Sequence, residues 1–280
     1  MANIRIITSN DADEATLSAS PAVLAALPVG NLQTQSRARV MRTNSVVNAQ
    51  HILGNFSEVK YLSALALVRH NLTSAASWRL RLYDDVNQTG NETYDSGTVE
   101  LGNPAAYGEF SWGLEPWGGD SFRDWPVAFS LLWFTPALAL SFDLQIDDAA
   151  NTDGYLEASR LFMGTYWSPE NNMSYGVRLQ WVDPSTQERT DGGTLRTDAV
   201  ESHRRWEFDL SALAPGEAAQ LQDILRRSGM RNDLFLSCFP ELGGDIEINY
   251  AGAVKLAQNA GLVHDVHNNF RTDVLTFDEA

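Results

Sequence analysis

Short runs of apolar residues, separated by turn-forming residues, dominate this chain. Residues 78–83 (WRLRLY) alternate, with Trp78, Leu80 and Leu82 on one side and arginine or tyrosine on the other. This pattern is typical of a strand with one exposed face. Residues 59–69 carry apolar side chains on both sides, which predicts a strand buried on two faces. Short strands of this kind, separated from one another by turn residues, predict antiparallel β structure.

The most apolar window, residues 126–144, is close to the length of a membrane-spanning segment. Pro136 lies near its middle and Asp143 near its end, and the window is rich in Phe, Trp and Ser. These features favour two buried strands split by a turn, and we expect no membrane span.

In the second half of the chain, two alternating segments, 175–182 and 203–210, flank a turn-rich segment at 183–193. Strands are also expected at 234–239 and 274–277. These segments predict a second, smaller antiparallel β region.

One long helix is predicted near residues 215–228. Pro215 suits the first helical position, Arg226 and Arg227 suit the last turn, and Gly229 supplies the stop. A boundary near Gly164 therefore divides the chain into a larger β domain over 1–164 and a smaller antiparallel β domain with this helix over 165–280.

Charge and cysteine content exclude several classes of function. The chain carries 36 acidic and 20 basic residues, a formal net charge of −16. We expect no direct nucleic-acid binding, because phosphate contacts need clustered Lys and Arg. The single cysteine, Cys238, rules out an intramolecular disulfide and a cysteine-based zinc site. The first ten residues lack the pattern of a secretory signal peptide.

No catalytic motif with a recognisable spacing is present, and we predict no enzymatic activity, no cofactor and no metal. His264 and His267 stand three apart without a third ligand, which favours a solvated loop. Residues 147–154 concentrate oxygen donors as a calcium loop would, but the EF-hand glutamate is missing. A polar turn is favoured there, and whether an ion binds stays open. The oxygen donors are Asp147, Asp148, Asn151 and Asp153.

Residues 108–126 combine Trp112, Trp117 and Trp125 with several glycines. Such a loop either packs over the open end of a β-sandwich or presents aromatic rings to a partner, for example a sugar. Arginines Arg37 and Arg39 favour ion pairs at the surface or between subunits. Four carboxylates near the tryptophans leave a glycosidase open as an alternative. They are Glu109, Glu115, Asp120 and Asp124.

Several of these stretches occur together in one known kind of domain. Residues 53–56 (LGNF), 67–72 (LVRHNL) and 78–83 resemble the start of a discoidin-like (galactose-binding-like) jelly roll, and 147–164 resembles its closing hairpin. The version with RHNLTS and RLFMGTYWSP resembles tail and baseplate proteins of tailed bacteriophages. Residues 204–210 (RRWEFDL) are similar to the C-terminal β region of minor tail proteins.

The resemblance implies a structural subunit of a phage tail tip or baseplate, assembled in the bacterial cytoplasm. Such a subunit would form a ring of identical copies around the tail axis and link hub, tube and fibre components. The contact residues predicted on this interpretation are aromatic and arginine side chains. They are Trp112, Trp117, Trp125, Arg37 and Arg39. The alternative is a carbohydrate-binding module that recognises a glycan on the host surface.

Overall fold

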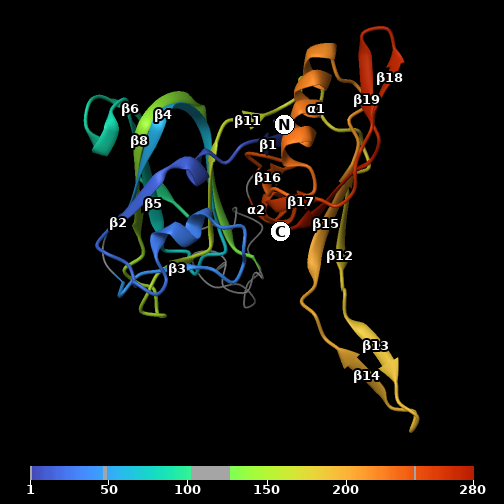
Figure 1. Cartoon of the computed structure of the whole chain (residues 1–280), viewed down its shortest axis with the longest axis horizontal. Coiled ribbons are helices and arrows are strands. Elements are labelled where there is room, and N and C mark those ends of the chain that lie inside the picture. The colour runs from blue at the N-terminus through green and yellow to red at the C-terminus, as the bar shows by residue number, and fades with distance from the viewer. Residues whose placement is uncertain (1, 47–48, 102–126, 243) are drawn as a thin grey trace, which may run out of the picture. The chain divides into compact units, whose positions relative to one another are not determined.

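The computed structural model describes residues 2–46, 49–101, 127–242 and 244–280 (Figure 1). The chain forms two compact units. One is the sandwich unit, Ile6–Trp167, and the other is the C-terminal unit, Ser168–Ala280 together with Met1–Arg5. The predicted class, mainly β with an N-terminal β-sandwich and a smaller antiparallel β domain, is confirmed.

Antiparallel strands build the sandwich unit, with three short 3-10 helices between them. Its elements are β1 (Arg5–Ile7), η1 (Asp11–Glu14), β2 (Thr16–Ser20), η2 (Val29–Gln33), β3 (Met41–Arg42), β4 (Gln50–Val68), β5 (Ser77–Tyr83), η3 (Val86–Gln88), β6 (Glu92–Asp95), β7 (Val99–Glu100), β8 (Phe129–Asp147), β9 (Glu157–Ala158), β10 (Arg160–Gly164) and β11 (Tyr166–Trp167). The main sheet has the order β10-β4-β8-β5-β6, with β2 added to β4 and β7 to β5.

The long strands β4 and β8 bend, and this bend turns one sheet into two facing layers (Figure 1). Their pairing shifts register between Asn55 and Lys60 and again between Leu62 and Ala64. The first part of β4 pairs with β2 and the last part with β10. A β-bulge of this kind bends a strand and increases its twist.

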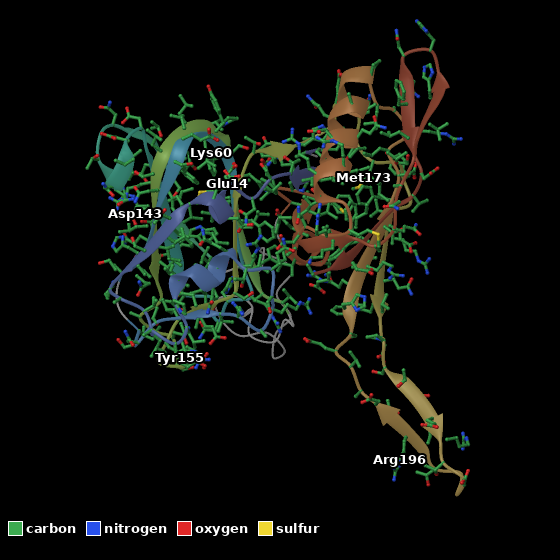
Figure 2. The ribbon with its side chains drawn as sticks, viewed as in Figure 1. Glu14, Lys60, Asp143, Tyr155, Met173 and Arg196 are labelled. Atoms are coloured by element: carbon green, nitrogen blue, oxygen red, sulfur yellow. The ribbon has the colours of Figure 1, made fainter. Side chains whose placement is uncertain are left out.

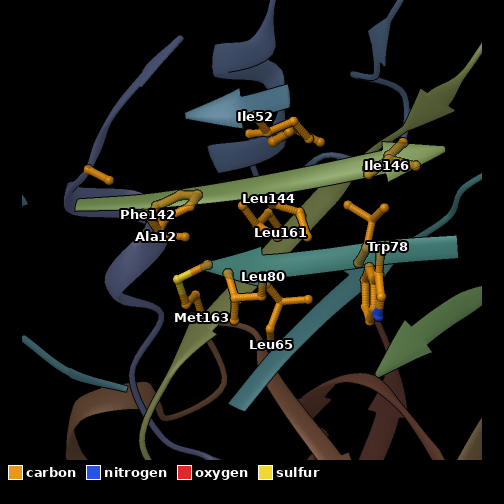
Figure 3. Close-up of a cluster of buried hydrophobic side chains, with 14 of the residues drawn as sticks. Ala12, Ile52, Leu65, Trp78, Leu80, Phe142, Leu144, Ile146, Leu161 and Met163 are labelled. Carbon is orange, nitrogen blue, oxygen red and sulfur yellow. The ribbon is translucent and has the colours of Figure 1, made fainter. Parts of the chain in front are cut away.

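Side chains from both parts of the bent strands meet in one core (Figure 3). Ile52 lies in the first part of β4 and Leu65 in the last part, and neither is exposed to solvent. Their sequence numbers differ by an odd amount, so in a regular strand their side chains would lie on opposite faces. The bulge reverses the alternation, and both side chains therefore reach the same core. Trp78 and Phe142 fill the same cluster.

The apolar window 126–144 was expected to form two strands split by a turn, and this expectation is wrong. A single strand, β8, runs from Phe129 to Asp147. Pro136 lies at the bulge, where β8 has extra residues between Trp133 and Ala137. Because a bulged residue needs no ladder hydrogen bond, proline is tolerated there without ending the strand.

The C-terminal unit contains a sheet in the order β16-β17-β20-β15-β12, with two separate hairpins, β13-β14 and β18-β19. Its elements are β12 (Arg178–Val182), β13 (Thr186–Arg189), β14 (Leu195–Asp198), β15 (His203–Phe208), α1 (Pro215–Ser228), β16 (Leu234–Ser237), α2 (Gly244–Asn249), β17 (Ala251–Leu256), β18 (Leu262–Val266), β19 (Asn269–Thr272) and β20 (Leu275–Glu279).

Helix α1 occupies the stretch for which the sequence predicted a helix, and it buries Ala218, Leu221 and Ile224. The carboxylate of Glu217 accepts a hydrogen bond from the backbone N–H of Ala214, at 2.9 Å, and so holds the start of the helix. The short helix α2 was not predicted, because a single turn carries too little periodicity to be recognised.

The expected first domain, 1–164, differs from the sandwich unit at the N-terminus. Residues Met1–Arg5 belong to the C-terminal unit. There the side chain of Asn3 donates hydrogen bonds to the carbonyls of Pro169 and Glu170, at 2.9 and 2.8 Å, and Arg5 pairs with Glu241 at 2.6 Å. These contacts join segments far apart in the sequence, so local pattern did not reveal them.

Candidate interaction surface

The three tryptophans predicted as contacts, Trp112, Trp117 and Trp125, lie outside the described residues, as do the four carboxylates around them. The two predicted arginines lie between η2 and β3. Arg37 is half-buried, and its carbonyl accepts a hydrogen bond from Arg69 at 3.4 Å. Arg39 is exposed. The assignment of these residues as contacts stays a prediction.

The oxygen-rich segment 147–154 is held to residues 71–73 by its own side chains. The Asp148 carboxylate is buried and accepts hydrogen bonds from the backbone N–H and the hydroxyl of Thr73, at 2.8 and 2.6 Å. Asn151 donates to the carbonyl of Asn71 at 2.8 Å, and Asp153 accepts from the Asn71 side chain at 3.0 Å. The protein's own donors thus occupy oxygens that a calcium ion would need. Among the described residues, no group of three or more His, Cys, Asp or Glu could hold a metal ion.

His264 and His267 share the β18-β19 hairpin, and the other histidines that the structure describes lie elsewhere in the chain. His264 lies in the β18-β19 hairpin, stacked on Phe270, where a loop was expected. His70 is buried, and burial lowers its pKa to about 4. Its Nδ1 accepts from the backbone N–H of Leu72 at 3.2 Å, so its Nε2 donates to the Ser130 hydroxyl at 2.8 Å. A neutral imidazole held on both nitrogens is a core residue.

A histidine and a carboxylate also meet on the outer face of the β4-β8-β5 sheet. Nδ1 of His51 lies 2.8 Å from Asp143, and Asp143 also accepts a hydrogen bond from Arg81 at 2.6 Å. A hydrolytic triad would need a nucleophile on the other histidine nitrogen. In the part of the chain that the structure describes, no serine, threonine or cysteine bonds to His51. The cluster is a cross-strand ion pair with a histidine beside it.

At the bend of β4, Lys60 lies among three carboxylates, and Figure 2 shows it next to Glu14. Lys60 Nζ is 2.7 Å from Glu14, 2.8 Å from Glu58 and 3.9 Å from Asp11. Burial raises the pKa of Asp11 to about 6, although Lys60 opposes the shift. Beside this cluster Tyr61 is 61 % exposed, and Leu138, its cross-strand partner, is 41 % exposed.

The β13-β14 hairpin is exposed along both of its strands. The turn-rich segment predicted over 183–193 contains β13 but not β14. Figure 1 shows the hairpin extending away from the sheet that contains β12 and β15. We call residues 183–202 the arm. Its two strands pair only with each other among the described residues, and every residue of both is exposed. Arg196 marks its outer part in Figure 2.

Local chemistry explains why the arm forms a hairpin. Asp191 and Gly192 occupy the turn, and Gly193 adopts a positive φ of 81° that favours glycine. The Thr190 N–H donates to the Thr194 carbonyl at 2.9 Å, and the Gly193 N–H donates to the Thr190 carbonyl at 2.8 Å. Threonines on both strands favour the extended conformation. The sequence predicts a turn over 183–193 because the polar residues there do not alternate with apolar ones.

Comparisons with known proteins leave the family of this chain open. No protein family profile matches it, and no curated protein matches it significantly. Among solved structures, chitosan-binding module 1 from a Paenibacillus chitosanase/glucanase is 14 % identical, covers 56 % of this chain and 99 % of its own, and has a TM-score of 0.39. The family 32 carbohydrate-binding module of Clostridium perfringens NanJ, in complex with galactose, is 13 % identical, with 59 % and 99 % covered and a TM-score of 0.37.

A Ruminococcus gnavus GH29 fucosidase in complex with fucose is 13 % identical, with a TM-score of 0.38. That match covers 58 % of this chain but only 27 % of the fucosidase. TM-scores below 0.5 at these identities show no shared family. Among the helices that the structure describes, none is long and apolar enough to cross a membrane.

Proposed function

We propose that this chain is a structural subunit that assembles with other copies of itself and with partner proteins. The observation that carries this proposal is the arm. A two-stranded hairpin that buries no core is marginally stable in water, and its unpaired strand edges invite further pairing. An arm of this kind is stabilised when a neighbouring chain covers it, which suits assembly better than catalysis.

The sequence resemblance to tail and baseplate proteins suggests the setting. We infer that the subunit belongs to the tail tip or baseplate of a tailed phage, where closed rotational symmetry repeats one interface. The net charge of −16 suits such a subunit, because it keeps chains soluble before they assemble. Other tail proteins and fibres are then its partners, and the virion is its location.

Two measurements test this function. Sedimentation of the purified chain, alone and mixed with tail proteins of a tailed phage, should show assemblies that a chain lacking the arm does not enter. Electron microscopy of virions labelled with an antibody against this chain should place the label on the tail. A chain that remains monomeric in every mixture and hydrolyses a polysaccharide would refute the proposal.

A carbohydrate-binding function is the second candidate, and an exposed aromatic residue favours it. Tyr61 presents its ring to solvent on the sandwich unit, and the sequence adds Trp112, Trp117 and Trp125 in one glycine-rich loop. Aromatic faces pack against the apolar C–H faces of sugars. A glycan array probed with wild type, Tyr61→Ala and Trp117→Ala decides: loss of one glycan signal in a variant supports this function, and no signal in wild type refutes it.

A further inference from the structure

The outer edge of β14 carries backbone groups that the hairpin does not use. In antiparallel strands, opposite residues alternate between hydrogen-bonded and non-bonded pairs. The hydrogen bond from Thr190 to Thr194 shows which pairs of β13 and β14 are bonded. Arg196 and Asp198 therefore turn their backbone groups toward β13, opposite Glu188 and Thr186. The intervening residues turn theirs outward. They are Leu195, Thr197 and Ala199.

The charges of β14 select one way for two copies of this strand to pair. When two identical antiparallel strands pair about a twofold axis, one residue must face its own copy. If that residue is Thr197, Arg196 faces Asp198 of the other copy and Asp198 faces Arg196, while Leu195 faces Ala199. If it is Arg196 or Asp198, two like charges meet directly, which destabilises the pair.

The backbone and the side chains agree on the same register. Thr197 has its N–H and C=O pointing outward, so it can form the bonded pair at the centre. Arg196 and Asp198 then fall at non-bonded positions, where side chains of opposite strands come closest. Among the described residues neither Arg196 nor Asp198 forms an ion pair, so both charges are available for a partner.

The outer edge of β13 offers no equivalent match. Its charges, Glu188 and Arg189, are adjacent in sequence. Across a twofold axis, two facing residues must both belong to bonded pairs or both to non-bonded pairs. Because the two kinds of pair alternate along the strand, the numbers of facing residues differ by an even amount. Glu188 therefore cannot face Arg189 of the other copy, and a register centred on either residue opposes like charges.

We propose that the arm binds the arm of a second copy, with the two β14 strands antiparallel and centred on Thr197. The product is a four-stranded sheet in the order β13-β14-β14-β13, with two Arg196–Asp198 pairs across the axis. The proposal rests on self-assembly as the function and adds to it the contact surface and its register. Symmetric contacts of this type join the same patch on both copies.

A cysteine scan of the arm tests the register directly. At the centre, the two Cα atoms of residue 197 are about 5.5 Å apart, within the range that a disulfide spans, whereas those of 196 or 198 are about 8 Å apart. Under mild oxidation, the full chain with Thr197→Cys should form a covalent dimer, and Arg196→Cys and Asp198→Cys should not. Cys238 is buried and gives little background.

Charge exchange tests the recognition without any cross-link. Arg196→Asp and Asp198→Arg each bring like charges together twice, so each homodimer should dissociate about tenfold more readily in sedimentation equilibrium. An equal mixture of the two variants restores both opposite-charge pairs and should return to within about threefold of wild type. The control, Asp191→Arg at the turn, changes the charge by the same amount as Asp198→Arg and should shift the dissociation constant by less than twofold.

The outcomes separate this contact from the function on which it rests. If wild type assembles but cross-linking peaks at another residue, or the mixed variants fail to recover, the β14 contact is wrong and self-assembly stands. If neither wild type nor Thr197→Cys associates at any concentration, alone or with tail proteins, both proposals fall.

Discussion

The buried ion pair between β15 and β20 offers the most severe test of how the C-terminal unit is held together. The side chains of Arg204 and Glu279 are 0 % and 2 % exposed. Nε of Arg204 donates to Glu279 at 3.0 Å, and the backbone N–H of Arg204 donates to the other carboxylate oxygen at 3.1 Å. The guanidinium also donates to the carbonyl of Ile248, at 2.7 Å, next to the end of α2.

Glu279→Gln keeps the size of the side chain and removes its charge. It leaves the Arg204 guanidinium buried without a counter-charge, which costs about 3–5 kcal/mol. Replacing both residues, as Arg204→Met with Glu279→Leu, removes both charges and should recover at least half of that loss, because two apolar side chains incur no desolvation penalty. The carbonyl of Ile248 loses its donor in this variant, so full recovery is not expected.

The single cysteine supplies a local assay for this unit. Cys238 is fully buried next to β16, and burial raises the pKa of its thiol, so it reacts only when the C-terminal unit opens. Thiol labelling during a urea titration therefore reports the unfolding of this unit alone. The reasoning is refuted if Glu279→Gln lowers the free energy of unfolding by less than about 1 kcal/mol, or if the double variant is no more stable than the single one.

Three further predictions concern the sandwich unit. Gly54→Ala should destabilise it by about 1–3 kcal/mol in thermal unfolding, because an added Cβ would lie 2.1 Å from the Phe142 ring; Gly30→Ala, with nothing within 4 Å, is the control. The raised pKa of Asp11, about 6, means that its proton is held more tightly in the folded state, so stability should fall as the pH rises from about 4 to 6. Asp11→Asn should remove that slope in urea titrations across this range, and an unchanged slope would contradict the assignment. The pKa of His70 is lowered to about 4, so stability should be lost as the pH falls from about 6.5 to 4; His70→Gln should flatten this decline, and an equal decline in the variant would show that another group causes it.

Local sequence pattern determined the structure wherever one element has one buried face. The alternation of residues 78–83 falls within β5, whose side chains are alternately buried and half-exposed along its whole length. Helix α1 is equally local, because its apolar stripe and its terminal residues are read within one segment. The excess of acidic residues and the single cysteine likewise follow from composition alone.

Tertiary contacts decided what lay beyond one segment. Pro136 resembles a turn in the sequence, and only its place in a bulge between two bent strands keeps β8 continuous. Asp148 resembles a calcium ligand, and only its hydrogen bonds to Thr73 show that the protein itself satisfies it. Residues 183–193 look like a turn, because a hairpin that buries nothing has no apolar alternation to reveal its strands. Periodicity shows which face of an element is buried, so contacts between distant segments and fully exposed strands leave little trace in it.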